Sequence, residues 1–266
     1  MQTVKKNKNI FDLILGTGAV TWLLFVLLWW FMSLFQEDIL LPGPLKALQG
    51  SVEIITNGKL FLFAGISFRR VFVGWSLGCL FGIPFGVLIG RVYVVRKIFE
   101  PFLNFFRFVP GLALITLFLL WFGVGEGAKI VIIFYGTMFT VAVNVIAGIL
   151  SMDQSRIYAA AILGADEKDI LLTVIWPSVI PYAFTGARLG LGGAFGSIVA
   201  AEMVAAKEGI GYLIYNSRLY FRTDWIIAGV ITLGLMGYLS DLIFRKLGNV
   251  TIHSLITLPA FLSNNT

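Results

Sequence analysis

Residues 158–177 read Tyr158-Ala-Ala-Ala-Ile-Leu-Gly164-Ala-Asp-Glu-Lys-Asp-Ile-Leu-Leu-Thr-Val174-Ile-Trp-Pro177, a polar segment between two apolar runs. Ala160 and Gly164 are four residues apart, which places both on one face of a helix. Small side chains on that face predict a flat surface that another protein can approach closely. Asp166 and the acidic residues after it add a polar stretch that can cap a helix. We therefore predict one exposed helix from Tyr158 to Asp169; an ordinary polar loop with a short helix is the alternative.

The rest of the chain is strongly apolar. Of its 266 residues, 58% are hydrophobic and 13% are charged, and the mean hydropathy is +0.91. Soluble domains carry about 25% charged residues, so this composition predicts an all-α integral membrane protein in a lipid bilayer. The net charge of +6 does not indicate a nucleic-acid partner, because the basic residues are scattered and form no basic face. A single cysteine, Cys79, and a single histidine, His253, exclude an internal disulfide and a His-rich metal site.

Apolar runs long enough to cross a bilayer, about 20 residues each, predict six transmembrane helices. The runs are 13–35, 71–90, 102–122, 130–150, 179–203 and 225–244. They divide the chain into an N-terminal segment (1–12), one transmembrane domain (13–247) with a polar loop at 151–177, and a C-terminal tail (248–266).

Basic residues orient these runs, because cytoplasmic loops carry an excess of lysine and arginine. With six crossings, one side of the membrane holds the basic residues before run one, after run two, between runs four and five, and after run six. We assign this side, with both termini, to the cytoplasm. These basic residues are Lys5, Lys6, Lys8, Arg91, Arg96, Lys97, Arg156, Lys168, Arg245 and Lys246. The opposite side also holds several basic residues, so the bias is small.

Two further patterns concern packing. Residues 45–63 form a moderately amphipathic stretch, which predicts a helix lying at the outer surface. Glycines recur every four residues from Gly74 to Gly90, a spacing that lets a second helix approach closely. Gly186, Gly190 and Gly193 predict the same kind of contact in the fifth run.

Catalytic and nucleotide-binding motifs are absent from the sequence. The glycine-rich stretch 123–129 lacks the Gly-Lys-Ser/Thr ending of a phosphate-binding loop. Arg188 and Glu202 are charged residues within an apolar run, where ionisable groups usually serve function. We consider both as candidates for a substrate pathway, since a guanidinium offers bidentate hydrogen bonds to an anion. The structural alternative for Arg188 is an ion pair with an acid such as Asp241.

The quoted segment resembles the EAA loop of ABC importer permeases, E-A-A-x3-G-x9-I-x-L-P. Tyr158 stands where the family has Glu, and Trp176 where it has Leu. The matching positions are Ala159, Ala160, Gly164, Val174 (for Ile) and Pro177. Between residues 40 and 247, further stretches resemble the nitrate/sulfonate/taurine/bicarbonate group of these permeases. These stretches are 41–44, 67–74, 82–86, 121–123, 200–203 and 209–214.

The resemblance implies a MetI-like, type I importer fold in the bacterial inner membrane. It implies a pore made of two permease copies, a periplasmic or lipoprotein substrate-binding protein, and a small, anionic cargo. Two ABC ATPase subunits would use ATP and Mg, so the chain itself would be no enzyme and would need no cofactor. They would dock on a coupling helix whose contact residues are Tyr158, Ala159, Ala160, Gly164, Ala165, Asp166 and Pro177.

Three alternatives stay open. The same type of permease could import a pyrimidine or thiamine precursor. A stand-alone channel or carrier would work without an ATPase, although a self-powered carrier usually needs buried acids in mid-membrane. An integral-membrane enzyme would need a cluster of histidines or acids at one depth. A neighbouring ATPase gene would favour the importer.

Overall fold

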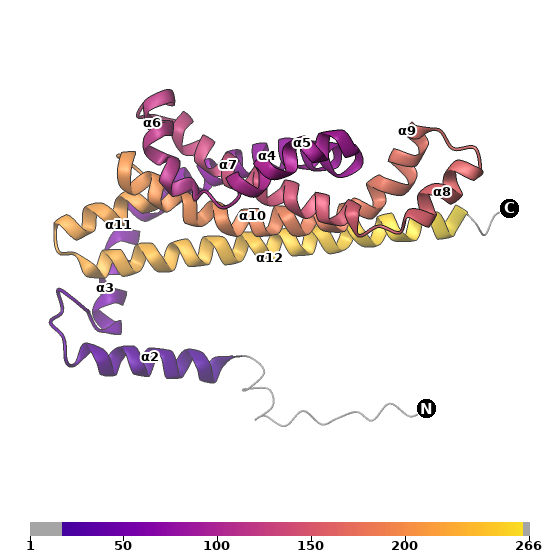
Figure 1. Ribbon diagram of the computed structural model, residues 1–266. Coiled ribbons are helices and arrows are strands. Elements are labelled where there is room, and N and C mark those ends of the chain that lie inside the picture. The colour runs from indigo at the N-terminus through magenta and orange to yellow at the C-terminus, as the bar shows by residue number, and fades with distance from the viewer. Residues whose placement is uncertain (1–17, 263–266) are drawn as a thin grey trace, which may run out of the picture.

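The computed structural model describes residues 18–262, with side chains as far as Gly248, and the described part contains helices and no strand. Figure 1 shows most of the helices bundled together, with α12 running along the whole bundle. The elements are α2 (Ala19–Ser33), α3 (Pro44–Thr56), α4 (Lys59–Arg91), α5 (Tyr93–Phe106), η1 (Gly111–Leu114), α6 (Ile115–Phe122), α7 (Glu126–Leu150), α8 (Gln154–Ile162), α9 (Glu167–Asp169), η2 (Ile170–Ile175), α10 (Trp176–Ala205), α11 (Ile210–Leu219) and α12 (Thr223–Leu262).

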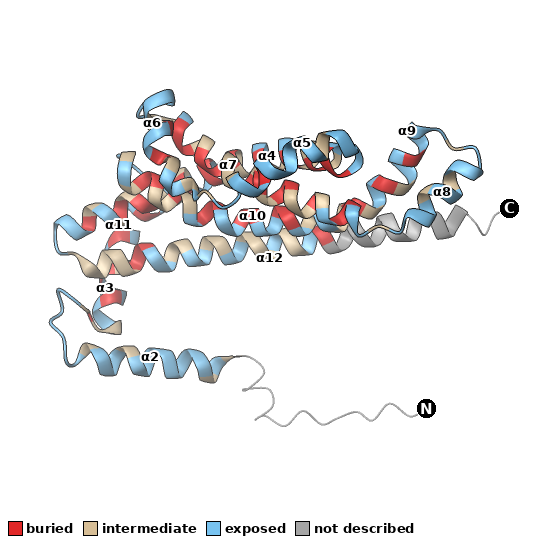
Figure 2. Ribbon diagram, in the orientation of Figure 1, coloured by how far each residue is buried: buried red, intermediate tan, exposed pale blue. Residues whose placement is uncertain are grey.

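Four of the predicted crossings correspond to helices that are long and apolar enough to span a membrane. They are α4, α7, the continuous helical stretch Glu167–Ala205 that ends in α10, and the part of α12 up to Gly248. Large apolar side chains remain exposed on these helices, and much of the ribbon in Figure 2 has the pale blue of exposed residues. Such a surface suits lipid contact, because lipid tails are as apolar as the side chains that face them.

The third predicted crossing, 102–122, is wrong as a single helix. α5 ends at Phe106 and a second helical stretch begins at Gly111, with an angle of 86° between the two parts. Pro110 lies at the break: it has no N–H to donate and disfavours helical geometry in the residue before it. The two parts form a broken span or a re-entrant segment.

The first predicted crossing is described only in part, because residues 13–17 lie outside the described range, as do residues 1–12. The visible helix α2 has 15 residues and lies apart from the bundle (Figure 1). A 15-residue helix is about 22 Å long at 1.5 Å per residue, shorter than the bilayer core. The count of six crossings and the cytoplasmic placement of the termini therefore stay predictions.

The amphipathic stretch 45–63 also divides. α3 begins with Pro44 at its first turn, where a missing N–H costs nothing. It ends at Thr56, and Gly58 adopts a φ of +69° that starts α4 in a new direction. One helix over the whole stretch was the wrong prediction, because a left-handed glycine cannot continue a right-handed helix.

The glycine spacing in α4 does serve close packing. A Cβ added at each of Gly74, Gly78, Gly82, Gly86 and Gly90 would collide with α7. The α7 residues met in turn are Ile133, Thr137, Val141, Val145 and Ile149, also four apart.

The same part of α7 also meets α10: Gly186 and Gly190 of α10 touch Val141 and Thr137, whereas Gly193 has open space and the predicted contact there is wrong. The helices α4, α7 and α10 thus pack against one another, and this group of three helices is the core of the fold.

Candidate functional site

The segment 151–177 projects from one end of the bundle. Figure 1 shows α8 and α9 beyond the ends of α4 and α7, near the C-terminal end of α12. Asp153 is the N-cap of α8, and its carboxylate accepts a hydrogen bond from the Ser155 N–H at 3.0 Å. Hydrogen bonds from Ser155 also hold the pKa of Asp153 below its ordinary value. A helix of nine residues is marginal alone, so this cap helps to form it.

Gly164 lies just past the end of α8, so it does not share a helical face with Ala160. Its φ is +87°. Its N–H donates to the Ala161 carbonyl and the Ala165 N–H donates to the Ala160 carbonyl, both at 3.1 Å. This is the Schellman arrangement, which needs a left-handed residue just past the helix. The predicted single helix from Tyr158 to Asp169, with Ala160 and Gly164 on one face, is therefore wrong.

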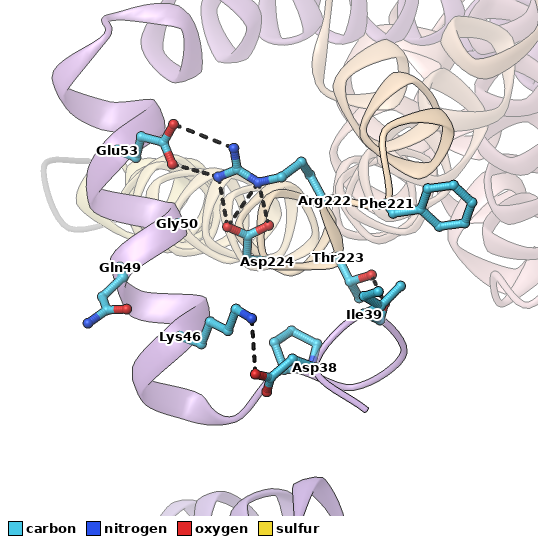
Figure 3. A pocket seen from close by; sticks show the side chains of 11 residues that line it. Asp38, Ile39, Lys46, Gln49, Gly50, Glu53, Phe221, Arg222, Thr223 and Asp224 are labelled. Carbon is cyan, nitrogen blue, oxygen red and sulfur yellow. Dashed lines mark hydrogen bonds and ion pairs between the residues drawn. The ribbon is translucent and has the colours of Figure 1, made fainter. Parts of the chain in front are cut away.

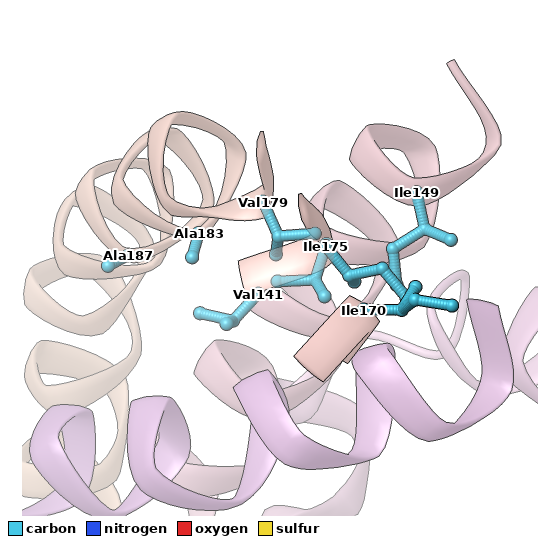
Figure 4. Close-up of a cluster of buried hydrophobic side chains, with 8 residues drawn as sticks. Val141, Ile149, Ile170, Ile175, Val179, Ala183 and Ala187 are labelled. Carbon is cyan, nitrogen blue, oxygen red and sulfur yellow. The ribbon is translucent and has the colours of Figure 1, made fainter. Parts of the chain in front are cut away.

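The inner face of α8 packs on the protein itself. Ile157, Ala160 and Ala165 contact the cluster of buried side chains that includes Ile149, Ile170 and Ile175. Figure 4 shows Ile170 and Ile175 beside Val141, Ile149 and Val179 in this cluster. Ala160 thus holds α8 to the bundle and does not offer a flat outward surface.

The return path from α8 to α10 includes a wide turn. Asp166 caps α9 by accepting a hydrogen bond from the Asp169 N–H at 2.7 Å. The π-helical η2 follows and leads directly into Trp176 and Pro177 at the start of α10. Pro177 has no N–H for the Thr173 carbonyl, and its ring crowds that carbonyl, which favours a widened turn.

The C-terminal part of α8 and the residue after it expose large apolar side chains. Ile162 and Leu163 are 86% and 87% accessible, and Tyr158 is 65% accessible. Exposed apolar groups on a polar projecting segment mark a surface that a partner covers. Tyr158 points outward where the resemblance expected it to make contact, and Ile162 and Leu163 were missed by the sequence reasoning. Their signal was two adjacent large apolar residues directly before a glycine.

Glu202 lies in a closed polar network far from this segment in sequence. It is 1% exposed. Its carboxylate accepts hydrogen bonds from the Ser67 hydroxyl at 2.8 Å, the Gly211 N–H at 2.8 Å and the Arg70 guanidinium at 2.7 Å. The same guanidinium also binds Glu126 and the Glu208 carbonyl. This network joins α4, α7, α10 and α11, so its groups satisfy one another within the protein.

Arg188 has a carboxylate partner. Its guanidinium binds Asp241 of α12 through Nε at 2.5 Å and Nη2 at 3.0 Å. Asp241 also lies 3.3 Å from Arg245. Arg188 and Asp241 border a cavity between α10 and α12 whose remaining lining is apolar or glycine. The ion pair agrees with the structural alternative considered for Arg188, while pathway roles for Arg188 and Glu202 stay predictions.

We expect the Arg188–Asp241 pair to act as a tie between α10 and α12. Arg188→Gln should reduce the yield of folded, partner-bound protein, because Asp241 would keep only Arg245. The double variant Arg188→Gln with Asp241→Asn should restore part of that yield, since neither position then carries an unpaired charge. Arg245 also loses its carboxylate, but its side chain is 43% exposed. Size-exclusion chromatography in detergent measures it. A single variant that assembles normally but transports poorly would instead support the pathway role.

A second polar cluster lies at the end of the bundle opposite to α8 and α9. Figure 3 shows Arg222 between Glu53 of α3 and Asp224 at the start of α12. The nitrogen–oxygen distances are 2.5 Å to Glu53 and 2.8 Å to Asp224. The hydrogen bond from Arg222 lowers the pKa of Glu53. The cluster fastens α3 against the bundle.

These features define a helical membrane protein with a projecting segment that exposes apolar side chains. Residues 82–249 match the family described as the binding-protein-dependent transport system inner membrane component. The chain belongs to this family, the permeases of ABC importers.

Relatives and solved structures agree with that assignment. A probable ABC transporter permease protein of Brucella melitensis is 36% identical over 212 residues, which cover 80% of this chain and 86% of the relative. The taurine transport system permease protein TauC of Escherichia coli K12 is 34% identical over 240 residues, covering 88% and 86%. An inward-facing structure of the MetNI methionine ABC transporter shares the fold, with a TM-score of 0.65 at 21% identity and coverage of 75% and 97%.

Proposed function

We propose that this permease imports a small anionic solute, using ATP that separate ATPase subunits hydrolyse with Mg. The observation that carries the coupling is the projecting α8, whose exposed apolar side chains have no cover within the described chain. Because a cap fixes each end of α8, this segment would transmit a movement of the ATPase subunit to α7 and α10. Tyr158, Ile162 and Leu163 would contact the ATPase, with Ala159 beside them.

The cargo class is argued from relatives. One relative is named for taurine transport. A relative from Bacillus subtilis, 34% identical, is named for aliphatic sulfonates, and one from Leptolyngbya laminosa, 30% identical, is named for nitrate. Taurine, sulfonates and nitrate all present a compact group of oxygens with negative charge. We propose the same class of cargo for this chain. Its proposed partners are a second permease copy and a separate substrate-binding protein.

Reconstitution tests this function. The chain would be co-expressed with the ATPase and binding protein encoded beside it, purified as a complex and placed in liposomes. We expect ATP-dependent uptake of taurine or nitrate, and no ATP hydrolysis by the permease alone. Uptake of a neutral pyrimidine in place of both anions would refute the cargo class. Uptake that proceeds without the ATPase would refute the coupling.

A further inference from the structure

The break between α5 and η1 borders an open cavity whose lining is part apolar and part polar. The cavity measures about 450 Å³ and lies between the break and the middle of α7. Its polar or small lining residues are Arg107, Gly111, Tyr135, Gly136, Thr140 and Asn144. No acidic residue is part of the lining that the structure describes.

The cavity lies at mid-height of the bundle and opens on its side, where Arg107 and Phe108 are exposed. Its α7 lining runs from Tyr135 to Asn144, the central part of a helix that extends from Glu126 to Leu150. The Tyr135 hydroxyl donates to the Phe106 carbonyl at 2.7 Å and so fixes the break at that depth. Non-helical backbone inside a membrane is tolerated where it is buried in protein or lines a water-filled cavity.

Arg107 differs in its partners from Arg70 of α4 and Arg188 of α10. Arg70 and Arg188 each hold a carboxylate. Within the described part of the chain, Arg107 has no carboxylate in ion-pair range; its guanidinium lies 4.7 Å from the centre of the Phe108 ring. A charge at this depth faces water or an opposite charge. An anion that enters the cavity would supply the opposite charge.

The remaining polar groups suit a small oxyanion. The Asn144 amide donates one N–H to the Thr140 carbonyl at 2.8 Å, which leaves a second N–H for a ligand. A guanidinium provides several N–H groups in a planar fork that matches the oxygens of such an anion. Gly136 keeps this wall open, because nothing lies within 4 Å of a Cβ built there.

We propose that this cavity is a binding site for the transported oxyanion, with Arg107 as its charged ligand and Asn144 as a second donor. The inference rests on the proposed anionic cargo and assigns it a place in the chain. Gly136 sets the size of the group that fits.

Four variants test the site in the reconstituted complex, with taurine and nitrate as the probes. Arg107→Gln should lower the uptake rate about tenfold or more at low probe concentration, since a charge-assisted contact is lost. Arg107→Lys should fall between Gln and wild type. Gly136→Leu should block uptake by filling the cavity, whereas Gly136→Ala should transport nearly normally. Arg96→Gln, on α5 but outside the cavity, is the matched control and should behave like wild type.

The possible outcomes distinguish a failure of the proposed binding site from a failure of the proposed function. Binding to the ATPase and basal ATP hydrolysis should survive in all variants. If wild type takes up anions and Arg107→Gln matches Arg96→Gln, the cavity is not the site, although the proposed function stands. If Arg107→Gln fails to assemble, the cavity is a contact between permease copies and the proposal is overturned. If wild type takes up neither probe, the proposed cargo and this site both fail.

Discussion

Replacing Gly164 with leucine should abolish transport while leaving membrane insertion normal. Gly164 has a φ of +87° and closes α8 through two hydrogen bonds. A leucine in the left-handed region costs about 1–2 kcal/mol, enough to unwind the last turn of a helix of nine residues. The exposed side chains of Ile162 and Leu163 would then lose their fixed position. Uptake and stimulated ATPase activity should both fall to background.

Asparagine at the same position is the matched control. It tolerates the left-handed region far better than leucine does, and open space surrounds a Cβ at Gly164. Gly164→Asn should therefore retain most of the uptake and most of the ATPase stimulation. Normal uptake by Gly164→Leu would show that the end of α8 does not matter for coupling. Equal loss in both variants would show that any side chain obstructs the partner, independent of backbone strain.

Replacing Arg70 with methionine should produce the largest loss of stability. The Arg70 side chain is 4% exposed and binds both Glu126 and Glu202. Removing the guanidinium leaves the fully buried Glu202 without a positive partner, and breaking a buried ion pair from one side costs about 3–5 kcal/mol. Thermal unfolding of the detergent-solubilised protein should show a clear fall in Tm.

Arg69 supplies the control from the adjacent position. Its side chain is 68% exposed and lies 3.4 Å from the same Glu126, and such pairs contribute about 0–1 kcal/mol. Arg69→Met should therefore change the Tm little. Adding Glu202→Gln to Arg70→Met should recover part of the loss, because no buried charge then lacks a partner: Lys129 keeps Glu126. An Arg70→Met variant as stable as Arg69→Met would contradict the network.

Local patterns in the sequence were sufficient for several parts of this structure. Four long apolar runs became four long helices, because the bilayer core sets the length of an apolar helix. The glycine spacing from Gly74 to Gly90 predicted a close helix contact, which α7 supplies. The spacing between Tyr158 and Pro177 led to the right family, although its helical geometry was misread at Gly164.

Other features depend on contacts between distant residues. Arg188 and Asp241 are separated by 53 positions, and Arg70 and Glu202 by 132. The sequence does not distinguish Arg70, Arg107 and Arg188, because each is an arginine within an apolar run or directly beside one. Only the packing of α4, α7, α10 and α12 decides which of them meets a carboxylate.

The sequence by itself determined the class of protein, its spanning helices and the projecting segment, since each follows from local hydropathy and spacing. Pro110 marks the break before Gly111 in the sequence, but the angle of 86° is known only from the structure. Tertiary structure alone decided the inward packing of Ala160 and the absence of a carboxylate beside Arg107 within the described chain. The physical reason is the cost of a bare charge in a membrane. That cost can be met by any acid the fold brings near, and chain order does not say which one that is.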